Sequence, residues 1–196
     1  MRYYIADCHF FHEALNREMD HRGFASVEEM NEYMIKRWNE KVRNRDEVVI
    51  LGDLSMGNAE QTNALLDRLQ GKLFLIVGNH DNRYLRSKTF HKERFGWIYP
   101  YAELHDDGRK VVLSHYPIAC YNGQYLKNKK GEPRTYMLYG HVHDSHDERL
   151  IEQYQQMVEK TRIPDRDGGT QALSSHMINC FCMYSDYQPL SLDEWI

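Results

Sequence analysis

Residues 73–81 read LFLIVGNHD, an apolar run that ends abruptly in glycine, asparagine, histidine and aspartate. A short, unbroken apolar run with branched and aromatic side chains is typical of a strand that is covered on both faces. Residues 48–53 read VVILGD and repeat the pattern. Buried strands with polar residues at their carboxyl ends indicate an open α/β sheet, because such sheets carry their functional sites at that edge.

Further strands and the helices between them extend this α/β pattern. Runs with strand character lie at residues 3–6, 111–113, 137–139 and 177–184. Ser26 and Glu29 have the spacing of a capping box, and apolar residues then recur at helical spacing. A second helix is predicted after Asn58 and ends at Gly71, and a third spans about residues 148–161. Strands that alternate with helices favour an α/β architecture.

The chain has 196 residues, the size of one domain, and we expect residues 1–196 to form a single domain. No apolar run approaches the ~20 residues of a membrane span, so no membrane partner is expected. The first residues, MRYYIAD, do not resemble a signal peptide, and a cytoplasmic location is predicted. The polar segment 163–175 is predicted to be a loop.

Charge and cysteine content limit the possible partners and the redox chemistry. The net charge of −4 disfavours a broad nucleic-acid surface, although nucleic acid stays open as a substrate. The chain has four cysteines, which we expect to be reduced. Cys180 and Cys182 are two residues apart in a predicted strand, so we expect both on one buried face.

Polar residues that can bind metal ions follow five successive predicted strands. They are Asp7 and His9, Asp53, Asn79 with His80 and Asp81, His115, and His141 with His143. Residues two apart in an extended chain point the same way, so each of the pairs 7/9 and 141/143 can bind one ion. A single histidine at a strand end is more often a hydrogen-bonded surface residue. Five strand ends together favour a dinuclear metal site, and these ligand types suit manganese, iron or zinc.

The motifs D-x-H, G-D, G-N-H-D, a single histidine and G-H-x-H, in this order between residues 5 and 143, resemble those of the calcineurin-like metallophosphoesterase superfamily. Residues 10–13, 38–39 and 187–194 resemble a small bacterial and phage branch of predicted phosphoesterases within it. In that branch the first motif usually continues F-G-H. Here Phe11 stands in place of the glycine, beside His12.

This resemblance implies a four-layer α/β/β/α sandwich with two mixed β-sheets, and a set of ligands. The first ion would bind Asp7, His9, Asp53 and His143. The second would bind Asp53, Asn79, His115 and His141, with Asp53 as the bridge. The two divalent ions are expected to be manganese, with iron, zinc, nickel or cobalt as alternatives.

The resemblance also implies roles for three residues beside the ligands. His80 would face the substrate as a catalytic residue, and Asp81 would orient it; support of a ligand is the alternative role for His80. His12 would contact the substrate phosphate, with a hydrogen bond at a helix start as the alternative.

The function implied is that of a metal-dependent phosphoric ester hydrolase, which cleaves a phosphodiester or phosphomonoester of a small molecule or nucleotide through a metal-bridging hydroxide. A catalytically silent binding module with the same fold is one alternative, and a nuclease is another. A Ser/Thr protein phosphatase is disfavoured, because residues 52–57 read GDLSMG without an arginine. The sequence leaves the substrate, the native metal and the oligomeric state open. It also leaves open whether the basic loop 127–134 is a solvated turn or binds a nucleotide.

Overall fold

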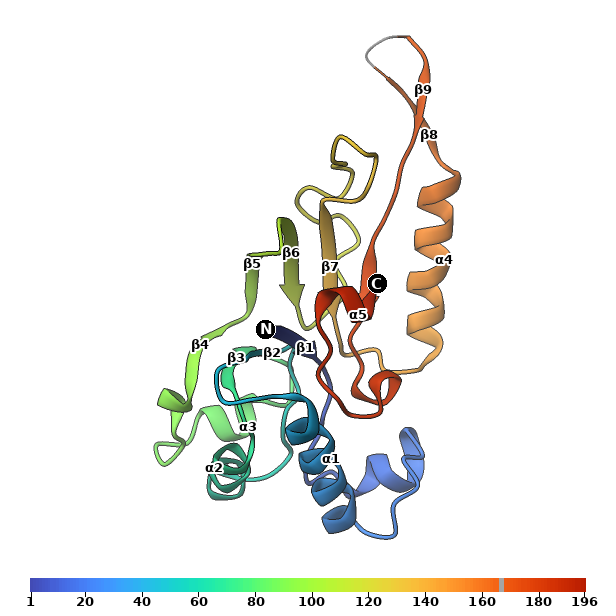
Figure 1. The fold of residues 1–196 in the computed structure, drawn as a ribbon. Coiled ribbons are helices and arrows are strands. Elements are labelled where there is room, and N and C mark those ends of the chain that lie inside the picture. The colour runs from blue at the N-terminus through green and yellow to red at the C-terminus, as the bar shows by residue number, and fades with distance from the viewer. Residues whose placement is uncertain (166–167) are drawn as a thin grey trace.

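The computed structural model describes residues 1–165 and 168–196, which form two four-stranded sheets and a small two-stranded one (Figure 1). In the first large sheet the strands lie in sequence order, and each neighbouring pair is parallel. Its strands are β1 (Arg2–Ile5), β2 (Glu47–Ile50), β3 (Lys72–Ile76) and β4 (Phe95–Tyr99). Both faces of this sheet are covered, which explains the unbroken apolar runs of the sequence.

The second large sheet has the strand order β10-β7-β6-β5 and is mixed. Its strands are β5 (Tyr101–Asp106), β6 (Arg109–Ser114), β7 (Thr135–Tyr139) and β10 (Met177–Asn179). Only β5 runs antiparallel to its neighbour, through a tight turn into β6. The predicted α/β fold is confirmed. The prediction that both sheets are mixed is wrong for the first sheet, in which every pair is parallel. The connections between its strands contain helices and return the chain to the same end of the sheet, so that each new strand runs in the same direction.

Two helices cover the outer face of the first sheet. The helix α1 (Val27–Lys41) begins as predicted, since the Ser26 side chain accepts a hydrogen bond from the Glu29 backbone. The helix α2 (Ala59–Arg68) begins with a capping box between Asn58 and Gln61. Shorter helical segments are η1 (Leu15–Met19, a π-helix), α3 (Asn82–Leu85), η2 (Lys92–Arg94), η3 (Cys182–Ser185) and α5 (Leu192–Trp195).

Three apolar clusters define how the layers pack. One fills the space between the first sheet and its helices and contains Trp38 of α1. A second joins the two sheets, with Val49 of β2 and Leu138 of β7 in the same cluster. The third contains Met137 of β7, with the partly buried Tyr154 of α4 (His146–Lys160) packed against it. This packing follows the order helix, sheet, sheet, helix that the resemblance implies.

The chain changes sheets after β10, which corrects the predicted strand 177–184. The Cys180 backbone donates to Tyr139 in the second sheet, whereas the Cys182 backbone donates to Ala6 at the end of β1. The strand therefore ends at Asn179, and a short helix follows. Cys180 lies in the apolar cluster between the two sheets. Cys182 lies in the apolar cluster between the first sheet and its helices, here called the cluster under α1. The prediction of one shared face is therefore wrong.

Part of the predicted loop 163–175 is a hairpin. The strands β8 (Arg162–Pro164) and β9 (Thr170–Ala172) pair antiparallel and extend with α4 away from the two large sheets (Figure 1). Their side chains are largely exposed, so the segment carries no apolar pattern of a strand. The predicted loop also includes residues 166 and 167, which lie outside the described residues. Among the described helices, none combines the length and the hydropathy that a membrane crossing requires.

Candidate metal centre

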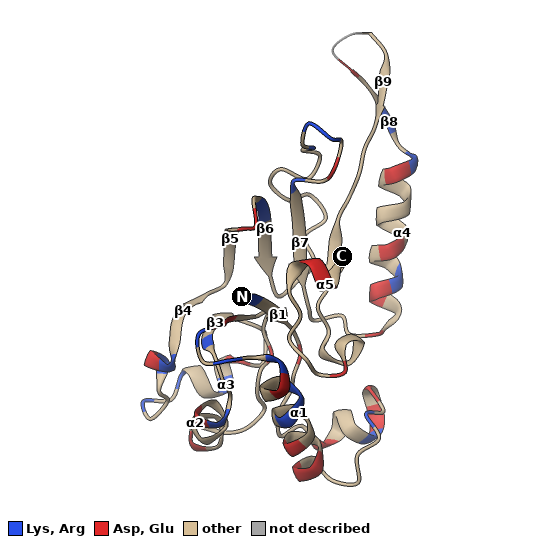
Figure 2. Cartoon of the chain, in the orientation of Figure 1, with Lys and Arg blue, Asp and Glu red and all other residues tan. Residues whose placement is uncertain are grey.

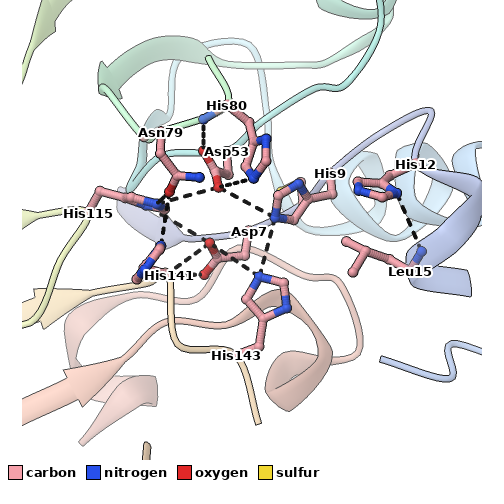
Figure 3. Close-up of polar contacts among 12 residues, drawn as sticks. Asp7, His9, His12, Leu15, Asp53, Asn79, His80, His115, His141 and His143 are labelled. Atoms are coloured by element: carbon pink, nitrogen blue, oxygen red, sulfur yellow. Dashed lines mark hydrogen bonds and ion pairs between the residues drawn. The ribbon is translucent and has the colours of Figure 1, made fainter. Parts of the chain in front are cut away.

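The predicted ligands converge at the carboxyl edge of the two large sheets (Figure 3). They follow the ends of five parallel strands, three in the first sheet and two in the second. The residues are Asp7 and His9 after β1, Asp53 after β2, Asn79 after β3, His115 after β6, and His141 and His143 after β7. Strand ends that lie far apart in the sequence thus supply one site.

Five of these residues have a left-handed backbone conformation. The φ angles are 54° at Asp7, 49° at His9, 54° at Asp53, 72° at His141 and 49° at His143. This conformation is uncommon outside glycine, and where the surrounding structure enforces it, it clusters at functional sites. The extended conformation expected for these residues is therefore wrong. Tight left-handed turns after the strands direct the side chains inward (Figure 3).

Two glycines allow the ligand carboxylates to approach neighbouring backbone. A Cβ atom added to Gly78 would lie 2.2 Å from Asp53 Oδ1, and one added to Gly140 would lie 2.5 Å from Asp7 Oδ2. Both contacts are closer than any real Cβ contact. The glycines of the G-N-H-D and G-H-x-H motifs are therefore required by the packing of the carboxylates.

One cluster of donor atoms joins the first and the last motif. The Nε2 atoms of His9 and His143 lie 3.2 Å apart, and His143 Nε2 lies 3.7 Å from Asp7 Oδ1. All three side chains can reach a single ion, since one ligand atom from each lies within 4.8 Å of the others. Asp7 is fully buried and His9 is 3% exposed. This cluster matches three of the four ligands that the resemblance implies for the first ion.

A second cluster surrounds Asn79. Its Oδ1 atom lies 2.9 Å from His115 Nε2 and 2.9 Å from His141 Nδ1. Asp53 Oδ2 lies 3.4 Å from His115 Nε2 and 3.6 Å from His9 Nε2, between the two clusters. By spacing alone Asp7, Asp53 and His115 also form a possible metal group. The assignment of each ligand to one ion stays a prediction, and the position of Asp53 suits a bridge.

The hydrogen bonds outside the clusters indicate which ring nitrogens face inward as acceptors. His115 Nδ1 lies 2.8 Å from the Leu51 carbonyl, which can only accept, so this nitrogen carries a proton. His143 Nδ1 lies 2.8 Å from Asp20 Oδ1 and donates in the same way. Each Nε2 atom then faces oxygens or another ring nitrogen. Acceptors that converge in this way fit divalent cations, and the oxygen and nitrogen donors suit manganese, iron or zinc.

The acidities of the two buried carboxylates differ because their neighbours differ. Burial raises the pKa of Asp7 to about 6, even though His143 and His115 act in the opposite direction. Burial also raises the pKa of Asp53, but its interactions with His115 and His9 outweigh burial and bring the pKa to about 2. Asp53 is therefore ionised at neutral pH, as a bridging ligand must be.

His80 lies beside the clusters and is accessible from the cavity. Its side chain is 41% exposed, and its Nε2 atom lies 3.9 Å from Asp53 Oδ2. Its backbone donates a 2.8 Å hydrogen bond to Asp53 Oδ1. His12 also lines the cavity, and its Nδ1 atom accepts a 3.4 Å hydrogen bond from the Leu15 backbone. The helix-start hydrogen bond considered for His12 is thus present, and its predicted phosphate contact stays a prediction.

Asp81 is fully buried and holds the backbone around the centre. One carboxylate oxygen accepts hydrogen bonds from the backbones of Asp53 (2.9 Å) and Gly78 (2.8 Å). The other accepts from the Leu54 backbone (3.0 Å) and the Tyr84 hydroxyl (2.7 Å). These groups occupy both oxygens. Asp81 thus holds the backbone of the ligand loops, and its predicted orientation of His80 stays a prediction.

Sequence reasoning missed Asp20 and Arg22. Asp20 contacts the predicted ligand His143, and the buried Arg22 contacts Asp20 and the backbone of Asp7 and Cys8. Neither follows a strand, because both lie in the irregular stretch after η1. The adjacent sequence carries no signal for either residue, because the contacts of Arg22 with Asp7 and Cys8 form only in the folded chain.

The centre opens into a cavity of about 610 Å³. The side chains of His12, Leu15 and Met19 line one part, and residues 141–147 line another. No lysine or arginine is among the described residues that line it, whereas Asp144 and Asp147 are. The basic loop 127–134 precedes β7, so it lies at the opposite end of that strand from His141 (Figure 2). Its residues line a separate cavity with Arg109.

Known proteins match this chain along most of its length. It matches the calcineurin-like phosphoesterase family model over residues 3–179. It is 35% identical over 146 residues to an uncharacterized protein of Methanocaldococcus jannaschii, with 74% of this chain and 70% of that protein covered. It is 28% identical over 167 residues to the Gene 66 protein of Mycobacterium phage L5, with coverages of 72% and 76%.

A solved structure has the same fold. A protein of unknown function from Aquifex aeolicus superposes with a TM-score of 0.65 at 24% sequence identity, covering 99% of this chain and 96% of that one. The family match includes every residue of the two clusters, from Asp7 to His143. With the sheets, the strand-end motifs and the matched region in agreement, the chain belongs to the calcineurin-like phosphoesterase family.

Proposed function

We propose that this chain is a metal-dependent hydrolase that uses a pair of divalent cations to cleave a phosphodiester or phosphomonoester of a small molecule or nucleotide. The observation that carries the proposal is the convergence of acceptor atoms in two adjoining clusters with Asp53 Oδ2 between them. Family membership supports phosphoester hydrolysis, and the clusters support metal binding. Manganese is the cation we expect, with iron, zinc, nickel or cobalt as alternatives.

When bound, paired divalent cations lower the pKa of water and polarise phosphoryl oxygens. The chain contributes the geometry for this chemistry. Asp7 and His9 with His143 would hold one cation, and Asn79 with His115 and His141 would hold the other, with Asp53 between the two groups. Gly78 and Gly140 leave room for the carboxylates of Asp53 and Asp7 beside the backbone.

His80 is the side chain best placed to act on the substrate itself. It is exposed to the cavity and lies 3.9 Å from Asp53 Oδ2, so its ring faces the position between the two clusters. A protonated ring can donate to the developing charge or to the leaving oxygen, and general acid assistance of this kind contributes about 10²–10⁴-fold to the rate.

The lining of the cavity favours a small substrate over a nucleic acid. Binding of a nucleic acid depends on lysine and arginine contacts to many phosphates. The described lining of this cavity holds neither residue, and Asp144 and Asp147 would repel additional phosphates. The basic loop that could provide such contacts belongs to a different cavity. A single phosphoryl group with an uncharged or hydrogen-bond-donating organic part fits better.

Hydrolysis of bis-p-nitrophenyl phosphate by the protein loaded with manganese, nickel, cobalt or zinc tests the proposal. Turnover with at least one metal, and its loss after chelation, is the expected result. A protein that binds two cations yet cleaves neither this diester nor p-nitrophenyl phosphate would instead be the catalytically silent binding module. Faster cleavage of single-stranded oligonucleotides than of small diesters would favour the nuclease. The free cysteines at residues 8, 120, 180 and 182 are consistent with a cytoplasmic location, which we also propose.

A further inference from the structure

Asp20 lies outside the predicted ligand set but contacts one of its members. Its Oδ1 atom accepts a 2.8 Å hydrogen bond from His143 Nδ1, and its side chain is 6% exposed. An ionised carboxylate can only accept, so the proton of a neutral His143 ring lies on Nδ1. The unprotonated Nε2 atom then faces His9 and Asp7, where a cation would bind.

Arg22 fixes the position of Asp20. Its Nε and Nη2 atoms donate to Asp20 Oδ2 at 3.0 and 2.9 Å, and its side chain is fully buried. The same guanidinium donates to the Cys8 carbonyl at 2.7 Å and to the Asp7 carbonyl at 3.1 Å. One side chain therefore joins the carboxylate behind His143 to the backbone of the loop that carries Asp7 and His9.

Other contacts hold the remaining sides of His143. Its ring stacks on Phe181, with centroids 4.6 Å apart and an angle of 20° between the planes. The Asn179 side chain donates a 2.9 Å hydrogen bond to the His143 carbonyl, which supports the left-handed backbone at this position. The ring is thus held on its face by Phe181 and at one edge by Asp20. The edge that bears Nε2 is the one presented to the cluster.

We propose that Asp20, held by Arg22, is a positioning residue of the metal centre, which keeps the proton on His143 Nδ1 and directs Nε2 toward the cation shared with Asp7 and His9. The carboxylate behind the ring also makes the imidazole a stronger donor. The inference rests on the proposed function for the use of the cation, but its direct effect is on metal affinity. It can therefore be tested without an assay of hydrolysis.

Isothermal titration of the metal-free protein with manganese is the first test. The Asp20→Ala variant should bind manganese about 10–100-fold more weakly than the wild type, the loss typical of removing a carboxylate behind a metal-binding histidine. The Asp20→Asn variant retains an acceptor oxygen for His143 Nδ1 and should lose less. Asp193→Asn is the matched control, because Asp193 pairs with Arg109 at 2.6 Å in a separate cavity, and its affinity should equal that of the wild type.

The tautomer of His143 gives a readout that a purely structural role of Asp20 would not change. In metal-free wild type at alkaline pH, where the ring is neutral, ¹H–¹⁵N correlation spectra should show the proton on Nδ1. In Asp20→Ala they should show a mixture with the Nε2-protonated ring, whereas Asp20→Asn should resemble the wild type. Thermal melting establishes whether each variant is folded.

A folded Asp20→Ala variant with wild-type manganese affinity and an unchanged tautomer would overturn the inference. If Asp20→Ala does not fold, Asp20→Asn decides: weaker manganese binding supports the inference, and wild-type binding overturns it. Failure of the proposed function is distinguishable, because it would appear as a wild-type protein that binds manganese but cleaves no phosphoester.

Discussion

His9 Nε2 faces His143 Nε2 at a distance of 3.2 Å, although 134 residues separate the two histidines in the chain. His143 uses its Nδ1 proton in the hydrogen bond with Asp20, so its Nε2 atom presents a lone pair. Two ring nitrogens at this distance are held together by a shared proton or by a cation. The adjacent carboxylates of Asp7 and Asp53 make a divalent cation the better match.

Replacement of His80 should separate catalysis from metal binding. His80 is exposed to the cavity and is not needed to complete either cluster, so His80→Gln should retain the manganese content of the wild type. Its kcat for bis-p-nitrophenyl phosphate should fall by about 10²–10⁴-fold, because the proposed general acid is lost. Steady-state kinetics and metal analysis of the same preparation check this. A variant with normal kcat would show that His80 only supports the site.

Replacement of Asp81 should chiefly affect stability. Each carboxylate oxygen of Asp81 accepts hydrogen bonds from two donors in a fully buried position. In asparagine an NH₂ group replaces one of these oxygens and faces two donors that it cannot accept from. We expect Asp81→Asn to lower the free energy of unfolding by about 3 kcal/mol or more, since buried donors lose a charged partner. Urea unfolding measures the change, with Asp193→Asn as an exposed control. A loss no larger than that of the control would contradict the positioning role.

Phe11 occupies a left-handed backbone position, at the place where the resemblance implies glycine. Its φ angle is 65°, and its ring packs against the cluster under α1. Both Phe11→Gly and Phe11→Ala lose the ring, but only glycine removes the cost of about 1–2 kcal/mol of a left-handed residue. The glycine variant should therefore be more stable than the alanine variant in urea unfolding.

The same pair of substitutions at Phe24 provides the control for Phe11. Phe24 is also partly buried against the cluster under α1, but it is not among the residues with a positive φ angle. There the alanine variant should be the more stable by about 0.5–1 kcal/mol, the usual difference outside the left-handed region. The same order of stability at both positions would contradict the assigned backbone strain.

Glu148 should give a measurable pH dependence of stability. Burial raises the pKa of this carboxyl above its ordinary value, although hydrogen bonds from Tyr139 and Asn179 act in the opposite direction. Because the folded protein binds the Glu148 proton more tightly than the unfolded chain, protonation favours the folded state. This contribution is complete below the ordinary pKa and is lost as the pH rises through the raised pKa. The wild type should thus gain stability relative to Glu148→Gln as the pH falls from about 7 to about 4. A difference that is constant with pH, or that has the opposite sign, would contradict this account of Glu148.

The sequence predicted the strand-end residues because their signal is local. An apolar run followed by Gly52 and Asp53, or by Gly78 and Asn79, marks both the end of a strand and a candidate ligand within a few residues. Parallel strands then bring those ends to one edge, so convergence follows from the fold class. The structure accordingly brings Asp7, Asp53, Asn79, His115 and His141 together with His9 and His143 (Figure 3).

The features that the sequence did not predict depend on tertiary contacts. Asp20 and Arg22 act through hydrogen bonds to His143 and to the backbone after β1, and nothing in the adjacent sequence indicates them. The change of sheet after Asn179 depends on pairing with Ala6, which separates Cys180 from Cys182. The left-handed turns at the ligands were also missed, because aspartate and histidine favour that conformation more than most residues but adopt it only in a small minority of positions.

The metal content of the Asp53→Ala variant tests the central claim most directly. Asp53 Oδ2 lies within 3.6 Å of His9 Nε2 and within 3.4 Å of His115 Nε2, so its carboxylate is the group that both clusters share. Metal analysis of the manganese-loaded protein should find two ions per wild-type chain, and fewer than two in folded Asp53→Ala together with loss of diester hydrolysis. A folded Asp53→Ala variant that retains both ions and wild-type hydrolysis would contradict the account.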